Sequence, residues 1–305
     1  MVLILSLKND FTTNLVIDWL CFYAKKHIRI NDSFTDVAFK SQKNYLKITN
    51  DSFLDIDHIS SFWFRKGTPF INTEDSEIIK DENKINQDYL SFLLQQKKSI
   101  GNTGGASKIN KLIALNIAAS FDLRIPKTFL VDNKNDLADL VINNSGKRYI
   151  IKAKTNISMY QFDDSSGMIF TNEVKKDDLE KFPEKFGFTL VQELIVKKFE
   201  IRTFFLKNKT WSMAIFSQND SQTENDYRRY NNDKPNRNTL FQLPTDIEEK
   251  LRLVMSKLNL DTGSIDWIYA DDNQFYFLEI NPIGQFTNLS FTCNYNLEKE
   301  VAKLL

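Results

Sequence analysis

Cysteine and histidine are scarce in this sequence, with two of each among 305 residues. Cys21 and Cys293 are too few for a disulfide framework and too isolated in the chain to form a metal site. His27 and His58 also lie apart, which argues against a histidine-based triad or a zinc centre. We therefore expect a reduced, cytoplasmic protein whose chemistry uses other side chains.

Glycine-rich phosphate signatures are missing as well. The sequence contains neither GxxxxGKS or GxxxxGKT nor GxGxxG, the loops that hold phosphates in P-loop and Rossmann nucleotide sites. A nucleotide site of either kind is therefore not predicted.

An excess of one charge is absent, because 40 basic and 40 acidic residues cancel. No global field therefore attracts the protein to nucleic acid or to an anionic membrane. The apolar stretch Met1–Leu7 is only as long as a strand and lacks a basic leader, so it predicts a buried strand and not a signal peptide. No later segment approaches the roughly 20 apolar residues that span a bilayer. We expect a soluble protein without nucleic acid or membrane as a partner.

The residues that are present suit a mixed α/β (α+β) fold with a large core. Hydrophobic residues make up 42% of the chain and aromatic residues 13%, which is enough for two or three subdomains. Over the first hundred residues the patterns predict strands at 2–7, 28–30, 45–49 and 59–65, and helices at 12–26 and 84–98. The run Gly101–Gly105 then predicts a first boundary.

A second unit is predicted to begin with a helix at about 108–121. Its apolar residues recur at helical spacing, and Ser107 is its expected N-cap. Beyond Pro126 we expect strands at 127–131, 148–154 and 167–172, with a helix near 134–143.

From about residue 189 the chain is rich in strand patterns, which predict strands at 189–196, 200–206 and 211–217. The polar stretch 218–242 is expected to be a long loop, and loops of that length are usually functional. Thr245–Glu248 has the sequence of a capping box and predicts the start of a helix. A final hairpin, 263–270 and 274–280, precedes a C-terminal helix.

That final hairpin carries the most specific set of polar residues. Because strand side chains alternate between faces, Glu279 and Asn281 share one face with Phe277, and pairing can bring Asp266 beside them. Two carboxylates and an amide oxygen are hard ligands that suit Mg²⁺ held jointly with phosphate oxygens. The alternative is that they are ordinary solvated strand residues, but aspartate is uncommon in strands. We therefore predict a magnesium site here.

Two polar residues of the strand at 200–206 lie on one face, because Glu200 and Arg202 are two positions apart. A carboxylate can accept hydrogen bonds from ribose hydroxyls, and an arginine can neutralise phosphate or acyl-phosphate oxygens. A surface ion pair is the alternative interpretation of this Glu-x-Arg sequence.

Further cations complete the predicted site. Lys152 interrupts a strand of buried type, where a charge is costly unless it is paired. Lys111 lies opposite the apolar stripe of its helix, and a solvated helix face is the alternative for it. Arg228 and Arg237 belong to the basic, aromatic part of the loop at 218–242, which could be merely solvated or touch nucleic acid. Given the neutral overall charge, we favour anion handling at an active site.

The types of these residues and their order along the chain resemble those of the ATP-grasp superfamily over roughly residues 100–305. The similarity is greatest to its peptide-modifying branch, which comprises microviridin-type peptide ligases and "grasp-with-spasm" peptide maturases. With an N-terminal motif included, the resemblance covers nearly the whole chain. The motifs that carry it are Phe62–Arg65, Ile125–Thr128, Gln192–Ile195, Ser217–Gln218, Asp226–Arg228, Pro235–Arg237, Gly263–Asp266 and Leu278–Gln285.

The resemblance implies an ATP-grasp fold of three subdomains, with ATP between the central and the C-terminal one and with ATP and Mg²⁺ as cofactors. We place the subdomains at residues 1–103, 104–190 and 191–305. The implied nucleotide contacts are Lys111 and Lys152 on phosphates, Gln192, Glu193, Leu194 and Ile195 around adenine, and Glu200 on ribose. The implied magnesium ligands are Asp266, Glu279 and Asn281, and the residues expected to stabilise an acyl phosphate are Arg202, Arg228 and Arg237.

The activity that the resemblance implies is that of an ADP-forming carboxylate ligase and peptide macrocyclase. Such an enzyme activates Asp or Glu side chains of a ribosomally made precursor peptide as acyl phosphates. It then forms intramolecular esters with Ser or Thr, or amides with Lys. The implied partners are the precursor peptide, with its leader and core, and a radical SAM/SPASM maturase and an exporter of the same pathway; a homodimer stays open.

One departure from many ATP-grasp enzymes lies between Lys152 and Met168. A glycine-rich phosphate lid is common there, but this sequence has only Gly167. The microviridin-type branch is similarly poor in glycine. Two alternatives also stay open: a ligase that adds free amino acids such as glutamate to a protein or peptide terminus, and a nucleotide- or peptide-binding module with a degenerate site.

Overall fold

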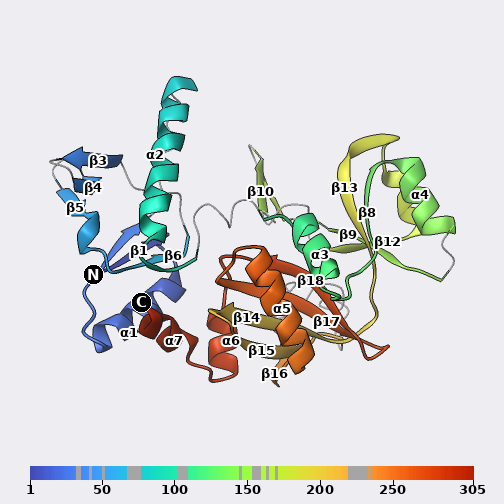
Figure 1. Ribbon diagram of the computed structural model, residues 1–305. Coiled ribbons are helices and arrows are strands. Elements are labelled where there is room, and N and C mark those ends of the chain that lie inside the picture. The colour runs from blue at the N-terminus through green and yellow to red at the C-terminus, as the bar shows by residue number, and fades with distance from the viewer. Residues whose placement is uncertain are drawn as a thin grey trace.

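The computed structural model describes residues 1–31, 36–40, 43–49, 52–66, 77–101, 109–143, 146–152, 159–162, 165–168, 171–218, 233 and 235–305. Strands and helices are mixed along the chain, as the sequence predicts. Figure 1 shows the N-terminal sheet on the left, a central sheet on the right, and a five-stranded sheet below and between them.

The N-terminal unit is built on a parallel sheet of order β2–β1–β6–β7. Its strands are β1 (Val2–Ser6), β2 (His27–Asn31), β6 (Ser61–Phe64) and β7 (Lys98–Ile100), and its helices are α1 (Phe11–Phe22) and α2 (Glu77–Gln95). All five residues of β1 are buried, because a parallel sheet is covered on both faces. This explains why the first strand reads as one continuous apolar run.

A small antiparallel sheet adjoins this unit. It consists of β3 (Asp36–Lys40), β4 (Lys43–Thr49) and β5 (Ser52–Asp55), and a 3₁₀ turn, η1 (Ile56–His58), follows it. Leu46 of β4 and Ile56 of η1 are buried in the same core as Leu3 and Leu5 of β1. The small sheet therefore extends the N-terminal core.

The central unit is an antiparallel sheet of order β12–β9–β13–β8. Its elements are β8 (Thr128–Asn133), α4 (Lys134–Asn143), β9 (Tyr149–Lys152), β12 (Asn172–Val174), the 3₁₀ helix η3 (Lys176–Lys181) and β13 (Lys185–Glu193). Leu137 of α4 packs with Val131, Tyr149 and Val191 of the sheet. A separate hairpin is formed by β10 (Met159–Phe162) and β11 (Ser165–Met168).

The five-stranded antiparallel sheet has the order β16–β15–β14–β17–β18. Its strands are β14 (Lys197–Leu206), β15 (Lys209–Phe216), β16 (Arg237–Phe241), β17 (Thr262–Ala270) and β18 (Phe275–Asn281). The helices of this part are α3 (Lys111–Ser120), α5 (Thr245–Lys257), α6 (Thr287–Thr292) and α7 (Leu297–Leu304). None of the described helices is long and apolar enough to cross a membrane.

Both faces of the five-stranded sheet are packed. On one face, Trp267 and Phe277 share a core with Leu115 of α3 and Leu251 of α5. On the other face, Phe204 belongs to a core that also contains residues of β1, α1, α6 and α7. The N-terminal unit and the five-stranded sheet therefore share one hydrophobic core, which holds the two sheets in a fixed relation beside the site described below.

Three local predictions are corrected by the structure. The stretch 218–242 is not loop throughout, because β16 pairs with β15. The helix predicted from 108 begins at Lys111 with Asn110 as its N-cap, and Ser107 lies outside the described residues. The capping box at Thr245 is wrong, since α5 begins at that residue with Pro244 as its N-cap and without a side-chain cap. Proline has no side-chain oxygen that could accept a hydrogen bond from the first N–H groups of the helix.

Other predictions differ in extent. The strand predicted at 167–172 is two strands, β11 and β12, which belong to different sheets. The sequence did not predict the short strands β3, β5, β7 and β10. These strands are three to five residues long, and in runs of that length the periodic signal is weak.

Candidate active site

A row of charged side chains crosses the five-stranded sheet on one face. Arg202 of β14 pairs directly with Asp266 of β17, which in turn pairs directly with Glu279 of β18. Directly opposed residues on antiparallel strands have side chains within about 4.5–5.5 Å at Cβ. The sheet therefore brings together three predicted site residues that lie up to 77 positions apart in the chain (202 and 279).

Each carboxylate of this row has a cationic partner. Arg202 Nη1 lies 3.0 Å from Asp266 Oδ1 and 3.2 Å from its Oδ2. Lys111, at the start of α3, places its Nζ 3.1 Å from Glu279 Oε2. These four side chains are only 10–23% exposed, so their charges are screened far less than those of surface pairs. The result is two adjacent carboxylates flanked by two cations.

A β-bulge corrects the predicted faces of β18. Asp266 is opposite Glu279, but the next residue, Trp267, is opposite Phe277, so Leu278 is the extra residue. Phe277 is consequently buried on the Trp267 side of the sheet, and it does not share a face with Glu279 as predicted. The bulge places an apolar ring in the core two residues before a carboxylate that enters the site.

Asn281 continues the polar face but uses its side chain locally. It is paired with Ser264 of β17, and its Oδ1 accepts hydrogen bonds from the backbone N–H groups of Ile283 (3.2 Å) and Gly284 (3.3 Å). Its amide oxygen therefore stabilises the turn that follows β18.

The predicted adenine segment forms the connection between the central sheet and the five-stranded sheet. The backbone N–H of Glu193 donates to Lys127 O and that of Leu194 to Arg148 O, at 2.9 and 2.7 Å. Gln192 is buried, and its Nε2 donates to Thr128 Oγ1 at 2.9 Å. Its Oε1 has no hydrogen-bond partner among the described residues, so a buried acceptor remains unsatisfied next to the connection.

The remaining predicted residues are not members of the charged row. Glu200 is on β14, on the same face as Arg202, and forms an ion pair with Lys197. Lys152 is half-buried on β9, opposite Leu190 of β13. Arg237 Cζ lies 5.7 Å from the centroid of the Phe216 ring, at the edge strand β16. Arg228 lies outside the described residues.

A cleft of about 620 Å³ opens over the charged row. One wall contains Arg202, Asp266, Glu279 and Asn281. The facing wall comes from the N-terminal unit and from the start of α6. Its members are Asn9, Asp10, Phe11, Thr12, Arg65, Lys66, Gln285, Thr287, Asn288 and Leu289. Arg65 and Gln285 belong to motifs named in the sequence analysis, but none of these residues was predicted to be part of the site.

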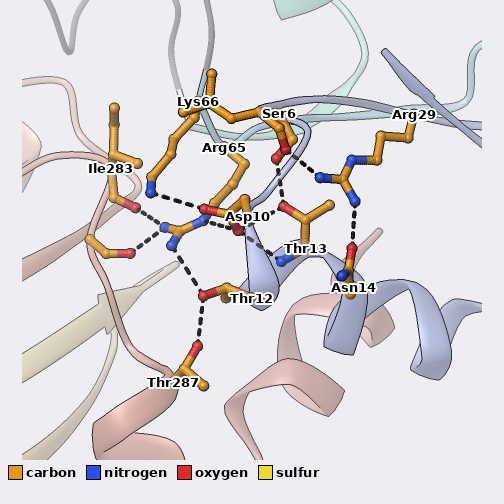
Figure 2. A network of polar contacts seen from close by, with 12 residues as sticks. Ser6, Asp10, Thr12, Thr13, Asn14, Arg29, Arg65, Lys66, Ile283 and Thr287 are labelled. Carbon is orange, nitrogen blue, oxygen red and sulfur yellow. Dashed lines mark hydrogen bonds and ion pairs between the residues drawn. The ribbon is translucent and has the colours of Figure 1, made fainter. Parts of the chain in front are cut away.

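The part of the facing wall that comes from the N-terminal unit contains a buried ion pair (Figure 2). Asp10 caps α1 by accepting from Thr13 N at 2.8 Å, and it also contacts Arg65 Nε at 3.4 Å and Lys66 Nζ at 3.0 Å. Burial alone would raise the pKa of Asp10, but the charge of Arg65, the ion pair with Lys66 and the Thr13 N–H together lower it to about 2. An Asp one position before a helical pattern is the signal that could have identified this residue as a cap.

The donor set of the charged row fits a magnesium ion. Among the described residues, no group of three or more His, Cys, Asp or Glu side chains lies together as a complete metal site. The row offers two carboxylates beside a cleft, and Mg²⁺ is usually bound in this way, through one or two carboxylates plus substrate phosphates and water. The residues therefore suit a cation that arrives with a phosphate ligand.

Of three comparisons with known proteins, the one with solved structures identifies the fold. No protein-family model matches the sequence, and no curated protein matches it either. Solved structures match over the whole chain, however, and they define the ATP-grasp fold. At the sequence identities given below, the likeness establishes the fold of this chain.

Three of these structures are informative. One is the macrocyclase MdnC of Microcystis aeruginosa MRC bound with precursor peptide MdnA, at 23% identity and TM-score 0.78, covering 100% of this chain and 99% of that one. Another is a RiPP-associated ATP-grasp ligase of Chryseobacterium gregarium in complex with ADP and a leader and core peptide, at 21% identity and TM-score 0.77, covering 99% and 94%. The third is the ATP-grasp ligase PsnB with minimal precursor, Mg and ADP, at 11% identity and TM-score 0.71, covering 99% and 96%.

Proposed function

We propose that this protein is an ATP-dependent carboxylate ligase that crosslinks a ribosomally made precursor peptide. The observation that carries the proposal is the charged row in the cleft, in which Asp266 and Glu279 are direct cross-strand neighbours flanked by Arg202 and Lys111. The likeness over the whole chain to ligases solved with precursor peptides supports the choice of substrate.

The nucleotide would lie between a central subdomain, residues 104–190, and a C-terminal subdomain, residues 191–305. Residues 1–103 would form a separate N-terminal subdomain. Adenine would meet the connection Gln192–Ile195, where the unsatisfied Oε1 of Gln192 is an acceptor for an amino group. Glu200 would bind the ribose hydroxyls. Lys111 and Lys152 would contact the phosphates.

Asp266 and Glu279 would hold Mg²⁺, which when bound neutralises charge on the phosphate oxygens. Asn281 is the third candidate ligand, although its Oδ1 is engaged by two backbone N–H groups in this structure. Because Arg202 and Lys111 already lie within 3.0–3.1 Å of the carboxylates, they are placed to contact anionic oxygens brought to the same face.

The chemistry would proceed in two steps. An Asp or Glu side chain of the peptide attacks the γ-phosphorus of ATP, so that ADP leaves and an acyl phosphate forms. A Ser or Thr hydroxyl, or a Lys amine, then attacks the acyl carbon, and inorganic phosphate leaves with formation of an ester or an amide. Arg202 would stabilise the acyl phosphate bidentately, with Arg228 and Arg237 as the next candidates. Positioning of the two reacting groups would supply much of the rate.

The direct test combines ADP release with mass spectrometry of the peptide. The protein is incubated with ATP, Mg²⁺ and a small peptide that carries repeated Thr and Asp/Glu and is encoded beside its gene. We expect loss of one water per ring formed, with one ADP released for each. The variant Asp266→Ala should lower turnover about 100-fold or more, whereas Asp271→Ala, an exposed carboxylate in the turn of the same hairpin, should have no effect.

Two outcomes decide against this function. If ADP release is equally fast with free glutamate and no peptide, the protein is an amino-acid-adding ligase, and mass spectrometry would show addition of residues. If nucleotide binds without any turnover in the presence of peptide, the protein is a binding module. Asp266→Ala with full activity would show that the metal assignment is wrong.

The location, the partners and the oligomeric state of the protein are also proposed. We propose that it works in the cytoplasm on a peptide with a leader and a core. A radical SAM/SPASM maturase and an exporter of the same pathway are proposed as further partners, and a homodimer is proposed as the assembly to test by light scattering.

A further inference from the structure

Arg65 is a buried cation between the N-terminal unit and the turn after β18. It follows β6, and only 1% of its surface is exposed. Its Nη1 donates to Ile283 O at 2.8 Å and also to Gly284 O, as Figure 2 shows for Ile283. A residue of the N-terminal unit therefore binds both carbonyl groups of a turn that lies more than 200 positions later in the chain (65 and 283).

The same turn is held from its other side by Asn281. The N–H groups of Ile283 and Gly284 donate to Asn281 Oδ1, so two consecutive residues have both their N–H and their C=O groups bonded by side chains. Gly284 also lies tight against β17, since a Cβ at this position would be 2.9 Å from Ser264 N, and its φ is +57°. The turn therefore has one defined position relative to the strand that carries Asp266.

We propose that Arg65 is a positioning residue for the magnesium site. By holding the carbonyls of Ile283 and Gly284, it sets where Asn281 and Glu279 lie relative to Asp266, and it acts through the turn and not through contact with the metal. This inference rests on the proposed function, because it assumes that the row binds Mg²⁺ together with a nucleotide.

An arginine is needed here for a geometric reason. The Nη1 of the guanidinium donates to the two carbonyl groups. Its Nε donates to Asp10 at 3.4 Å, and its Nη2 donates to Thr12 Oγ1 at 3.3 Å. Lysine has one nitrogen and cannot reach these three directions at once. The change Arg65→Lys keeps a positive charge beside Asp10, but it loses part of the hydrogen bonding to the carbonyl groups of Ile283 and Gly284.

The test measures magnesium binding without turnover. Binding of fluorescent mant-ADP is titrated with Mg²⁺, and the thermal midpoint is recorded in parallel. For Arg65→Lys we expect the Mg²⁺ concentration at half-saturation to rise about 10–100-fold, as it does when partners that orient metal ligands are lost, with unchanged mant-ADP affinity in EDTA. Arg29→Gln removes another arginine of the N-terminal sheet, which contacts Asn14, Leu7 O and Lys8 O, and it should leave the half-saturation unchanged.

A second comparison covers the case in which Arg65→Lys does not fold. Neutralising Arg65 alone would deprive the buried Asp10 of one of its two cationic partners, so Asp10→Asn is compared with the double variant Asp10→Asn/Arg65→Gln. The proposal expects the double variant to need about 10-fold more Mg²⁺ than Asp10→Asn. Equal half-saturation in this pair, or a lowered thermal midpoint in Arg65→Lys with unchanged half-saturation, would overturn the positioning role. Failure of the unaltered protein to bind mant-ADP in a Mg²⁺-dependent way would instead overturn the proposed function.

Discussion

Replacing Asp10 by asparagine should destabilise the protein by an amount that follows from the pKa of this carboxyl group. Its pKa is about 2 in the folded protein, against the ordinary value of 3.8. The lowered pKa corresponds to about 2 kcal/mol of stabilisation at pH 7. Asparagine keeps an oxygen that can accept from Thr13 N, so the loss measures mainly the charge interactions with Arg65 and Lys66.

The sign of the pH dependence follows from the lowered pKa. The stabilisation is fully present above the unfolded value of 3.8 and is lost as the pH falls from about 4 to about 2, because protonation then favours the unfolded chain. The free energy difference between the unaltered protein and Asp10→Asn should therefore be about 2 kcal/mol at pH 7 and about 1 kcal/mol at pH 3.

Urea denaturation followed by circular dichroism at a series of pH values measures this difference. The matched control is Asp18→Asn, an exposed carboxylate on the same helix, which should change the stability by less than about 0.5 kcal/mol. A difference below about 0.5 kcal/mol for Asp10→Asn at pH 7, or one that is the same at pH 7 and pH 3, would show that the reasoning about this ion pair is wrong.

Three further predictions concern the proposed nucleotide site and the five-stranded sheet. Glu200→Gln should weaken ATP binding about 10-fold or more through loss of charge-assisted hydrogen bonds to ribose, and unchanged affinity in fluorescent-nucleotide titration would contradict the assignment. Trp267→Ala should lower the free energy of unfolding by about 3–5 kcal/mol, because the ring is fully buried. Trp267→Phe should lower it clearly less, because Nε1 of Trp267 has no partner among the described residues and no hydrogen bond is lost. Equal urea midpoints for the two variants would refute this. Gly284→Ala should lower the free energy of unfolding by about 1–3 kcal/mol, because Gly284 has a positive φ and an added Cβ would lie 2.9 Å from Ser264 N. An unchanged urea midpoint would show that the turn can move.

Elements with long, regular patterns could be predicted from the sequence. The helix expected at 134–143 has those bounds in the structure, and the final hairpin differs by one residue at three of its four ends. Short strands such as β7 and the edge strand β16 were not predicted, because pairing with a neighbouring strand stabilises them more than their own composition does.

The candidate site divides in the same way. Asp266, Glu279 and Arg202 stand out because charged groups interrupt apolar strands, and such groups need partners. The facing wall, which includes Asp10 and Lys66, was not predicted. In the sequence these two residues are typical of a helix cap and of a surface position. They line the cleft only because the N-terminal unit packs beside the five-stranded sheet.

The amino-acid sequence by itself determined which residue types could bind a nucleotide and a hard cation, and which strands would carry them, since strand periodicity and the cost of buried charge are local properties. Only the tertiary structure decided their register. The bulge at Leu278 sets Glu279 opposite Asp266 and turns Phe277 into the core. The structure also decided that Arg65, remote in sequence, holds the turn after the last strand, because a contact across more than 200 residues (65 and 283) depends on how separate units share a core and not on any local pattern.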